Sequence, residues 1–334
     1  MKIAFFECEK WEEDFVKTEL KDHEVDFFDE PLSEDSVFQK NDYEAISVFI
    51  NSRINEKTIS FFPNLKFVTT RSTGFDHIDV DFCKSRNIIT SYVPGYGDNT
   101  VAEFAFGLIL NLTRKIYQAV DRVKEYGNFS LDGLRGIDIK GKTIGIIGTG
   151  RIGREAISIA NGFGMNILAY DVFPNVSLET QFNFKYVSLE DLLKNSDVIS
   201  LHCPLTKETF HLINSSNIQY IKPGAYLINT ARGGLIETKA LVEAIHNNIL
   251  AGAAIDVFEE ESGTENEFGL INSGKVSEQT ISTILENDIL MKMPNVLITP
   301  HNAFNSKEAL MRILQTTLQN IQGFLSNSPI NLIP

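Results

Sequence analysis

A glycine-rich turn near the middle of the chain has the residue types and spacing that bind the phosphates of a dinucleotide. The turn reads Gly148-Thr149-Gly150-Arg151-Ile152-Gly153 and follows the short apolar run 143–147. In this pattern the glycines permit a tight turn and let the backbone approach a pyrophosphate. A helix predicted over 154–163 would direct its N-terminal N–H groups and positive dipole end at the phosphates. A purely structural glycine turn is the alternative.

An acidic residue at the end of the next predicted strand supports the dinucleotide interpretation. That strand covers 166–170 and ends at Asp171, about 20 residues after the turn, where a carboxylate accepts hydrogen bonds from ribose hydroxyls. A carboxylate here would repel the additional phosphate of NADP, and no arginine or lysine occurs in 172–175. The pattern therefore predicts NAD as the cofactor.

Two further polar residues follow predicted strands, where open α/β sheets bind their ligands. Arg232 follows the strand 225–229 and precedes two glycines, which suits a planar carboxylate held by two hydrogen bonds. His301 follows the strand 296–299, and histidine exchanges protons near neutral pH. A solvated loop arginine and a structural histidine are the alternatives. The remaining histidines are expected to be structural or at the surface: His23, His77, His202, His211 and His246.

Two more turns carry weaker signals. Glu259, Glu260 and Glu261 follow the predicted strand 252–257, and local pattern alone favours a solvated acidic loop without choosing among them. Thr73 and Gly74 follow the strand 67–71, and successive backbone N–H groups in such a turn form a small anion-binding concavity. No HExxH, CxxC or paired-histidine pattern is present, so no metal site is expected.

The elements that position these residues alternate between strands and helices. Strands are expected at 2–6, 24–28, 45–50, 67–71 and 88–91, then at 143–147, 166–170, 197–202, 225–229, 252–257 and 296–299. This alternation predicts parallel sheets with helices on both faces. A chain of 334 residues is long enough for two such domains.

Turn-forming residues at 94–99 mark a boundary between the domains. Thr100, with Glu103 three residues later, predicts a capping box at the start of a long helix. Residues 101–112 are apolar nearly all round, so we expect this helix to be buried between the domains or against a second subunit. A C-terminal helix at 307–325 is expected to return to the first domain. The expected domains are 1–100 with 301–334, and 101–300.

Composition excludes several classes of partner. The net charge of −14 argues against nucleic acid and anionic membranes, because both require a positive surface. Three unclustered cysteines indicate free thiols in a reducing compartment. The N-terminus does not read as a signal peptide, and the longest apolar stretch, 101–110, is too short to cross a bilayer. A cytoplasmic protein is expected.

Taken together, the segments resemble the NAD-dependent D-2-hydroxyacid dehydrogenases, most closely their D-lactate dehydrogenase branch. The resemblance covers nearly the whole chain, and the motifs occur in the family's order: RSTGFDHID, PGYGDNTVAEFAFGLIL, GTGRIG, CPLTKET, NTARGGL, AAIDVFEEE and MPNVLITPHNAF. It implies two doubly wound parallel-sheet domains, a Rossmann NAD-binding domain (101–300) and a flavodoxin-like substrate domain (1–100 and 301–334). It also implies a homodimer.

The resemblance assigns roles to these residues. Arg232 would hold the substrate carboxylate, His301 would give a proton to the keto oxygen, and Glu261, five residues after the strand-end Asp256, would orient the imidazole. The implied substrate contacts are Thr73, Gly74, Tyr96, Arg232, His301 and Phe304. The implied NAD contacts are Gly148, Gly150, Arg151, Ile152, Gly153, Asp171, Cys203, Pro204, Thr209, Thr230, Ala231, Arg232 and Asp256.

Some positions depart from the family pattern and leave the substrate open. Asn305 and Ser306 follow Phe304 where D-lactate dehydrogenases typically read AFYT or AYYT, and no proline follows Glu261. Phe304, and Phe49 as a further candidate, would give the pocket an apolar wall. Reduction of pyruvate to D-lactate is the expected reaction. Glyoxylate, hydroxypyruvate or a bulkier aliphatic 2-oxoacid are the alternatives, and a non-enzymatic NAD(H) sensor is the alternative of another class.

Overall fold

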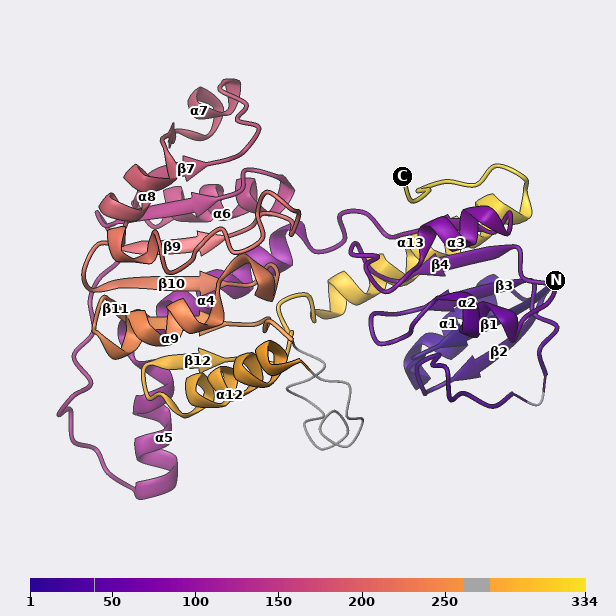
Figure 1. The fold of residues 1–334 in the computed structure, drawn as a ribbon, viewed down its shortest axis with the longest axis horizontal. Coiled ribbons are helices and arrows are strands. Elements are labelled where there is room, and N and C mark those ends of the chain that lie inside the picture. Colours follow the sequence, from indigo (N-terminus) through magenta and orange to yellow (C-terminus); the bar gives the residue numbers. More distant parts are fainter. Residues whose placement is uncertain (39, 261–276) are drawn as a thin grey trace. The chain divides into compact units, whose positions relative to one another are not determined.

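The chain forms two compact units in the computed structural model, which describes residues 1–38, 40–260 and 277–334. Unit 1 comprises Met1–Tyr96 and Ser306–Pro334, and unit 2 comprises Gly97–Asn305 (Figure 1). The polypeptide therefore passes from unit 1 to unit 2 after Tyr96 and returns after Asn305.

Unit 1 is built on a five-stranded parallel sheet. Its strands are β1 (Lys2–Phe6), β2 (Glu24–Phe28), β3 (Ala45–Val48), β4 (Phe67–Thr70) and β5 (Ile89–Ser91), in the order β2-β1-β3-β4-β5. This is the strand order of a flavodoxin-like, doubly wound sheet. The predicted flavodoxin-like fold of this part of the chain is confirmed.

Helices cover both faces of this sheet because its strands are apolar on both sides. On one face, Ile3 and Phe5 of β1 pack against α1 (Lys10–Glu19) and α13 (Lys307–Leu325). On the other face, Ala4 and Phe6 belong to the core that includes residues of α2 (Glu56–Ser60) and α3 (Val80–Ser85). The C-terminal helix α13 thus returns to the N-terminal unit, packing against α1 and β4.

Unit 2 is built on a seven-stranded parallel sheet. Its strands are β6 (Thr143–Ile147), β7 (Asn166–Tyr170), β8 (Lys185–Tyr186), β9 (Val198–Leu201), β10 (Ala225–Asn229), β11 (Leu250–Ile255) and β12 (Val296–Ile298). Their order is β12-β11-β10-β9-β6-β7-β8, which is the Rossmann order with one further strand at the edge. The order reverses between β6 and β9, and nucleotides bind at such a switch point.

Two helical layers enclose this second sheet (Figure 1). One contains α4 (Asp98–Arg114), α6 (Arg151–Gly162) and the short α7 (Ser177–Phe182). The other contains α8 (Leu189–Asn195), α9 (Thr238–His246) and α12 (Glu278–Lys292), with two short 3₁₀ turns at Ile218–Tyr220 and Gly233–Leu235. A further helix, α5 (Ile116–Tyr126), follows α4 and has no buried residue.

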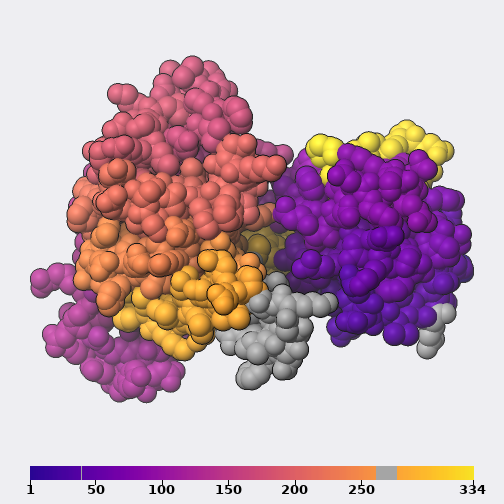
Figure 2. All heavy atoms as spheres, viewed as in Figure 1, coloured from indigo at the N-terminus to yellow at the C-terminus, as the bar shows by residue number. Residues whose placement is uncertain are grey.

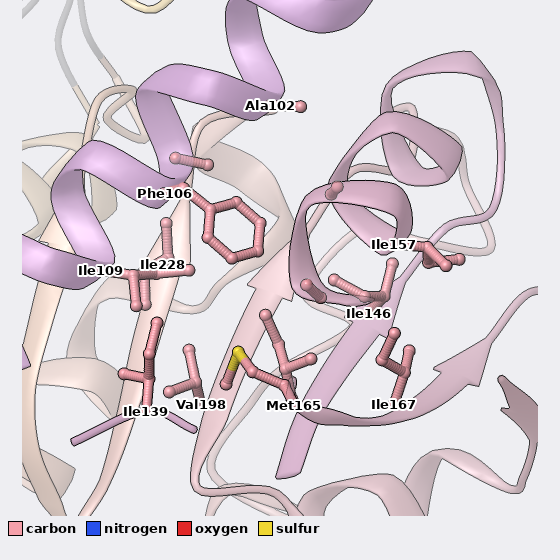
Figure 3. Close-up of a cluster of buried hydrophobic side chains, with 14 of the residues drawn as sticks. Ala102, Phe106, Ile109, Ile139, Ile146, Ile157, Met165, Ile167, Val198 and Ile228 are labelled. Atoms are coloured by element: carbon pink, nitrogen blue, oxygen red, sulfur yellow. The ribbon is translucent and has the colours of Figure 1, made fainter. Parts of the chain in front are cut away.

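The apolar helix α4 differs from its prediction in where it begins. It begins at Asp98 with Gly97 as N-cap and no side-chain cap, so the predicted Thr100 capping box is wrong; Glu103 instead accepts a hydrogen bond from the Asn99 side chain (2.9 Å). Its buried side packs within unit 2, against α6 and the sheet. Figure 3 shows Phe106 and Ile109 of α4 in this core beside Ile146 and Ile228 of the sheet.

No helix among the described residues combines the length and the apolar character needed to cross a bilayer. The three cysteines are free thiols, with Cys8 and Cys83 buried.

Candidate active site

The glycine turn between β6 and α6 has the geometry of a phosphate cradle. Gly148 adopts φ +96°, and a Cβ there would lie 2.7 Å from the Cys203 nitrogen; a Cβ on Gly153 would lie 2.0 Å from the Gly148 oxygen. Both positions therefore require glycine for the fold itself. A Cβ on Gly150 would meet nothing within 4 Å. Gly150 is the N-cap of α6 and provides no side-chain cap, so space is open at a helix N-terminus that attracts anions.

Asp171 lies at the carboxyl end of β7, beside this turn, and its carboxylate is held in place. Thr149 donates to Oδ2 from its backbone nitrogen (2.7 Å) and from its hydroxyl (2.9 Å). The Phe173 nitrogen donates to Oδ1 (2.9 Å). The Thr149 hydroxyl also contacts the Tyr186 hydroxyl of β8 (2.7 Å). Hydrogen bonds thus join the glycine turn to Asp171, the two features that the sequence pattern assigned to one dinucleotide site.

The loop after β9 lies against the same turn. The Thr209 hydroxyl donates to the Pro204 oxygen (2.7 Å) and accepts from the Thr206 nitrogen (2.7 Å), which fixes the path of 203–209. Burial raises the pKa of Cys203 to about 12, which disfavours the nucleophilic thiolate form. His202 is buried, contacts the Ser200 hydroxyl (2.9 Å), and has its pKa lowered to about 4 by burial, which agrees with the structural role predicted for it.

Arg232 lies in a tight turn that follows β10. The Asn229 side chain organises this turn: its Nδ2 donates to the Arg232 oxygen (2.8 Å) and its Oδ1 accepts from the Ala231 nitrogen (3.0 Å). A Cβ on Gly233 would lie 2.0 Å from the backbone of Phe258, so the arginine turn packs directly on the segment after β11. The Arg232 guanidinium is half-buried and donates to the Ala231 oxygen (2.7 Å).

His301 follows β12 in a loop that Asp256 holds. The Asp256 carboxylate is 1% exposed and accepts from the Thr299 hydroxyl, the Asn302 nitrogen (2.8 Å) and the Ala303 nitrogen (2.9 Å). The His301 nitrogen donates to the Asp256 backbone oxygen (2.9 Å). His301 itself adopts a left-handed backbone, φ +50°, a conformation that non-glycine residues adopt only where the surroundings impose it.

The register of the sheet places these loops side by side. Asn229, at the end of β10, pairs with Ile255 of β11, and Ile255 pairs with Ile298 of β12. Each of these residues is followed at once by its loop, so Arg232, Asp256 and His301 lie along one edge of one sheet. Phe304 lies edge-on to the His301 ring, with centroids 6.4 Å apart.

The acidic motif divides between the described residues and a segment outside them. Glu259 contacts His211 Nε2 (2.7 Å) and accepts from the Thr238 hydroxyl (2.9 Å). These contacts tie the motif to the loop after β9 and to the start of α9, which gives Glu259 and His211 structural roles. Glu261, the member selected as catalytic by the resemblance, lies outside the described residues.

Unit 1 contributes the remaining predicted substrate contacts. Thr73 and Gly74 follow β4, and their backbone nitrogens donate no hydrogen bond to any described residue. The Thr73 hydroxyl donates to the Val93 oxygen (2.8 Å). Tyr96 ends the first segment of unit 1, and its backbone oxygen accepts from Arg312 Nε of α13 (2.7 Å). The Thr73 hydroxyl therefore anchors the turn, while the Thr73 and Gly74 amide donors have no partner in the part of the chain that the structure describes.

Two supporting residues were not predicted from the sequence: Asn229, which positions the arginine turn, and Thr149, which positions Asp171. Asp256 was predicted only as an NAD contact, and in the structure its carboxylate accepts hydrogen bonds from the histidine loop. A signal for Asn229 was present, since asparagine bonded to the nitrogen two residues later is a common turn motif. The Asp256 contacts join residues more than forty positions apart, and no local pattern indicates them.

These residues fit NAD. The open space at Gly150, the fixed Asp171 carboxylate and the buried Thr230 hydroxyl, which has no hydrogen-bond partner among the described residues, are places for a pyrophosphate, a ribose and a further polar group of the cofactor. Across the described residues, no group of histidine, cysteine, aspartate and glutamate side chains could hold a metal ion.

Comparison with known proteins agrees with this geometry. The family model for the NAD-binding domain of D-isomer specific 2-hydroxyacid dehydrogenases matches residues 106–303. The chain is 36% identical over 330 residues to D-lactate dehydrogenase of Escherichia coli, covering 97% of this chain and 96% of that protein. It is 37% identical over 305 residues to an aromatic 2-oxoacid reductase of Clostridium sporogenes, covering 90% and 89%.

A solved structure shows the same likeness. D-Lactate dehydrogenase of Aquifex aeolicus, complexed with NAD and lactic acid, superposes with a TM-score of 0.82 at 37% identity, covering 98% of this chain and 96% of that one. The fold and the nucleotide site define an NAD-dependent oxidoreductase. The chain belongs to the D-isomer specific 2-hydroxyacid dehydrogenases.

Proposed function

We propose that this chain reduces pyruvate to D-lactate with NADH in the cytoplasm. The observation that carries the proposal is the common sheet edge of β10, β11 and β12, where Arg232 follows β10 and His301 follows β12, with β11 between the two strands. Similarity to D-lactate dehydrogenases over nearly the whole chain supports pyruvate as the substrate.

Each group has a distinct task in the proposed reaction. NADH, when bound, supplies the hydride that the keto carbon accepts. Arg232 binds the substrate carboxylate and stabilises the negative charge that develops on the carbonyl oxygen. His301 transfers a proton to that oxygen, and Glu261 orients its imidazole. The Thr73 and Gly74 amides bind the other side of the carboxylate.

Other 2-oxoacids are the second candidate. The aromatic ring of Phe304 stands beside His301, and a relative of similar identity is an aromatic 2-oxoacid reductase. Both observations favour a pocket with an apolar wall that could take a side chain larger than methyl. Glyoxylate and hydroxypyruvate, which are small or polar, would gain less from such a wall.

A steady-state panel tests the proposal. NADH oxidation would be followed with pyruvate, glyoxylate, hydroxypyruvate, 2-oxoisocaproate and phenylpyruvate, and each acid would be repeated with NADPH. We expect the highest kcat/KM with pyruvate and NADH. Arg232→Ala should lower kcat/KM by about 10²–10⁴-fold, because two charge-assisted hydrogen bonds are lost. A higher kcat/KM with any other acid, or full activity in His301→Ala, would contradict the assignment.

We also propose that two copies associate through α5. No residue of this eleven-residue helix is fully buried, and its apolar residues Tyr117, Val120, Val123 and Tyr126 are 57%, 45%, 40% and 77% exposed. A helix this short is marginal in water without packing, and in the space-filling view its segment stands out from the body of unit 2 (Figure 2, purple, lower left). A second copy would bury this surface.

Light scattering after size exclusion tests the association. The wild type should have twice the chain mass of 37.5 kDa, and Val120→Asp with Val123→Asp should give the monomer mass. Lys124→Ala, on the same helix, is the control and should leave the mass unchanged. A wild type that runs as a monomer at micromolar concentration would refute the proposal.

A further inference from the structure

A histidine outside the predicted site is joined to the carboxylate-binding turn of unit 1 by a short chain of hydrogen bonds. His77 Nε2 contacts the Thr70 hydroxyl (3.0 Å), which contacts the Ser72 hydroxyl (2.7 Å). The Ser72 hydroxyl donates to the Gly74 backbone oxygen (2.6 Å). Thr70 and Ser72 are 0% and 3% exposed, so water does not compete for these contacts.

The number of hydrogens on each group determines which atom donates in each bond of this hydrogen-bond series. Each hydroxyl carries one hydrogen, and Ser72 gives its hydrogen to the Gly74 oxygen. Thr70 must therefore donate to Ser72, and since its hydrogen is then used, His77 must donate to Thr70. The Nε2 atom of His77 thus carries a hydrogen. Burial lowers the pKa of His77 against the opposing effect of Glu7 and Asp76, which favours a neutral ring that carries its one hydrogen on Nε2.

The last acceptor in the chain lies in the turn itself. The bond from Ser72 to the Gly74 oxygen restricts rotation of the glycine backbone, which has no side chain to restrict it. At the other end, the His77 backbone oxygen accepts from the Ile54 nitrogen (2.9 Å). The chain therefore links a fixed backbone segment to the turn whose Thr73 and Gly74 amides remain available.

We propose that His77 is a positioning residue for the substrate carboxylate: through the Thr70 and Ser72 hydroxyls, its Nε2–H fixes the conformation of the Thr73–Gly74 turn. The inference rests on the proposed function, because the carboxylate is the ligand that this turn is proposed to bind. His77 does not touch the substrate, and its effect is expected on substrate binding rather than on the chemical step.

The tautomer of His77 tests the relay without any activity measurement. Two-bond ¹H–¹⁵N spectra of protein labelled at its six histidines distinguish an Nε2–H from an Nδ1–H ring, and His77→Gln assigns the signal. We expect His77 to be the Nε2–H tautomer at pH 7. An Nδ1–H ring would overturn the proposal, because no hydrogen would then be available for Thr70.

Kinetics test the consequence for binding. His77→Phe and Thr70→Val each remove one link, and both should raise KM for pyruvate by about five- to tenfold, the value of one hydrogen bond. They should leave kcat and KM for NADH within about twofold. His77→Gln keeps a side-chain N–H donor and should restore KM. Thr69→Val is the matched control: Thr69 is the neighbouring strand residue, and its hydroxyl accepts from Asn320 (3.3 Å) instead.

The outcomes separate the two proposals. An unchanged KM in folded His77→Phe and Thr70→Val, or an equal rise in Thr69→Val, would overturn the positioning role while leaving the proposed reaction intact. Absence of turnover with every 2-oxoacid would overturn the proposed reaction and the carboxylate role of the turn together. Circular dichroism of each variant establishes that it is folded.

Discussion

Asp256→Asn would separate positioning of the proton donor from cofactor binding. The Asp256 carboxylate accepts from the Thr299 hydroxyl and from the Asn302 and Ala303 nitrogens. Asparagine keeps one acceptor oxygen but places an NH₂ group where the second carboxylate oxygen was. At least one charge-assisted hydrogen bond is therefore lost, and its donor then faces the N–H donors of the asparagine. That change costs about 2–4 kcal/mol. The loop responds by moving, and it carries His301.

The size of the kinetic effect follows from that movement. A misplacement of about 1 Å in a reacting group lowers rates by about 10²-fold. We therefore expect kcat/KM for the 2-oxoacid to fall about 100-fold. The dissociation constant of NADH, measured by nucleotide fluorescence, should change by less than about twofold. The resemblance implies an NAD contact for Asp256, but its carboxylate oxygens are already bonded to the histidine loop, and the glycine turn and Asp171 lie at other strands.

Asp197→Asn is the matched control. Asp197 is an aspartate of the same unit that also binds backbone, accepting from the Thr143 nitrogen (2.9 Å), and it pairs with Lys222 (2.7 Å). It immediately precedes β9, at the amino edge of the sheet, opposite the edge that carries His301. It should lose stability in urea titration without losing kcat/KM. Wild-type kcat/KM in Asp256→Asn, or an equal loss in Asp197→Asn, would refute the reasoning.

Three further predictions follow from described contacts. Gly150→Ala should retain the wild-type melting temperature, measured by calorimetry, but weaken NADH binding at least about tenfold in a fluorescence titration. Gly153→Ala should lower the melting temperature and also weaken NADH binding, because only a Cβ at Gly153 meets backbone atoms. Tyr186→Phe should raise the NADH dissociation constant about two- to fivefold with unchanged kcat, since its hydroxyl supports Thr149 beside Asp171; an unchanged constant would exclude that support. Burial raises the pKa of Asp197, but the bonds from Lys222 and Thr143 prevail and lower it below 3.8. The ionised Asp197 therefore stabilises the fold fully above the pKa of the unfolded chain, and this stabilisation is lost as the pH falls through the lower pKa of the folded protein. The free energies of unfolding of wild type and Asp197→Asn, measured by urea titration, should converge in acid. A difference that stays constant with pH would contradict this.

The sequence predicted the parts of the fold whose signals are local. The strands predicted at 143–147 and 166–170 agree with β6 and β7, because β-branched apolar runs constrain the backbone wherever they occur. The helix predicted over 154–163 begins three residues earlier, at Arg151, within the glycine motif. The order of strands in each sheet agrees with the doubly wound class that the family resemblance implied. The start of α4 was misplaced, because the Thr100 pattern also fits a helix that begins two residues earlier, where Asp98 pairs with Arg151 (2.7 Å).

The supporting contacts of the site could not be predicted from local sequence, because they depend on how distant segments pack together. The sequence placed Arg232 and His301 after strands, but only the strand register brings those strand ends together. The His77 chain involves residues within eight positions of one another, yet its direction depends on which way two hydroxyls point. Residue type indicates a donor or an acceptor, and the folded backbone decides which partner it meets.

The anchoring of the histidine loop has a consequence for modularity. Asp256 holds the backbone at Asn302 and Ala303, and the chain leaves unit 2 after Asn305. His301, the proposed proton donor, is thereby built into the same unit as the nucleotide turn, while the Thr73–Gly74 turn belongs to unit 1. Arg232 and Phe304, which are proposed to contact the substrate, also belong to unit 2. Exchange of residues 1–96 and 306–334 for those of a relative would therefore replace the Thr73–Gly74 turn and leave Arg232, His301 and the nucleotide turn together on one piece of polypeptide.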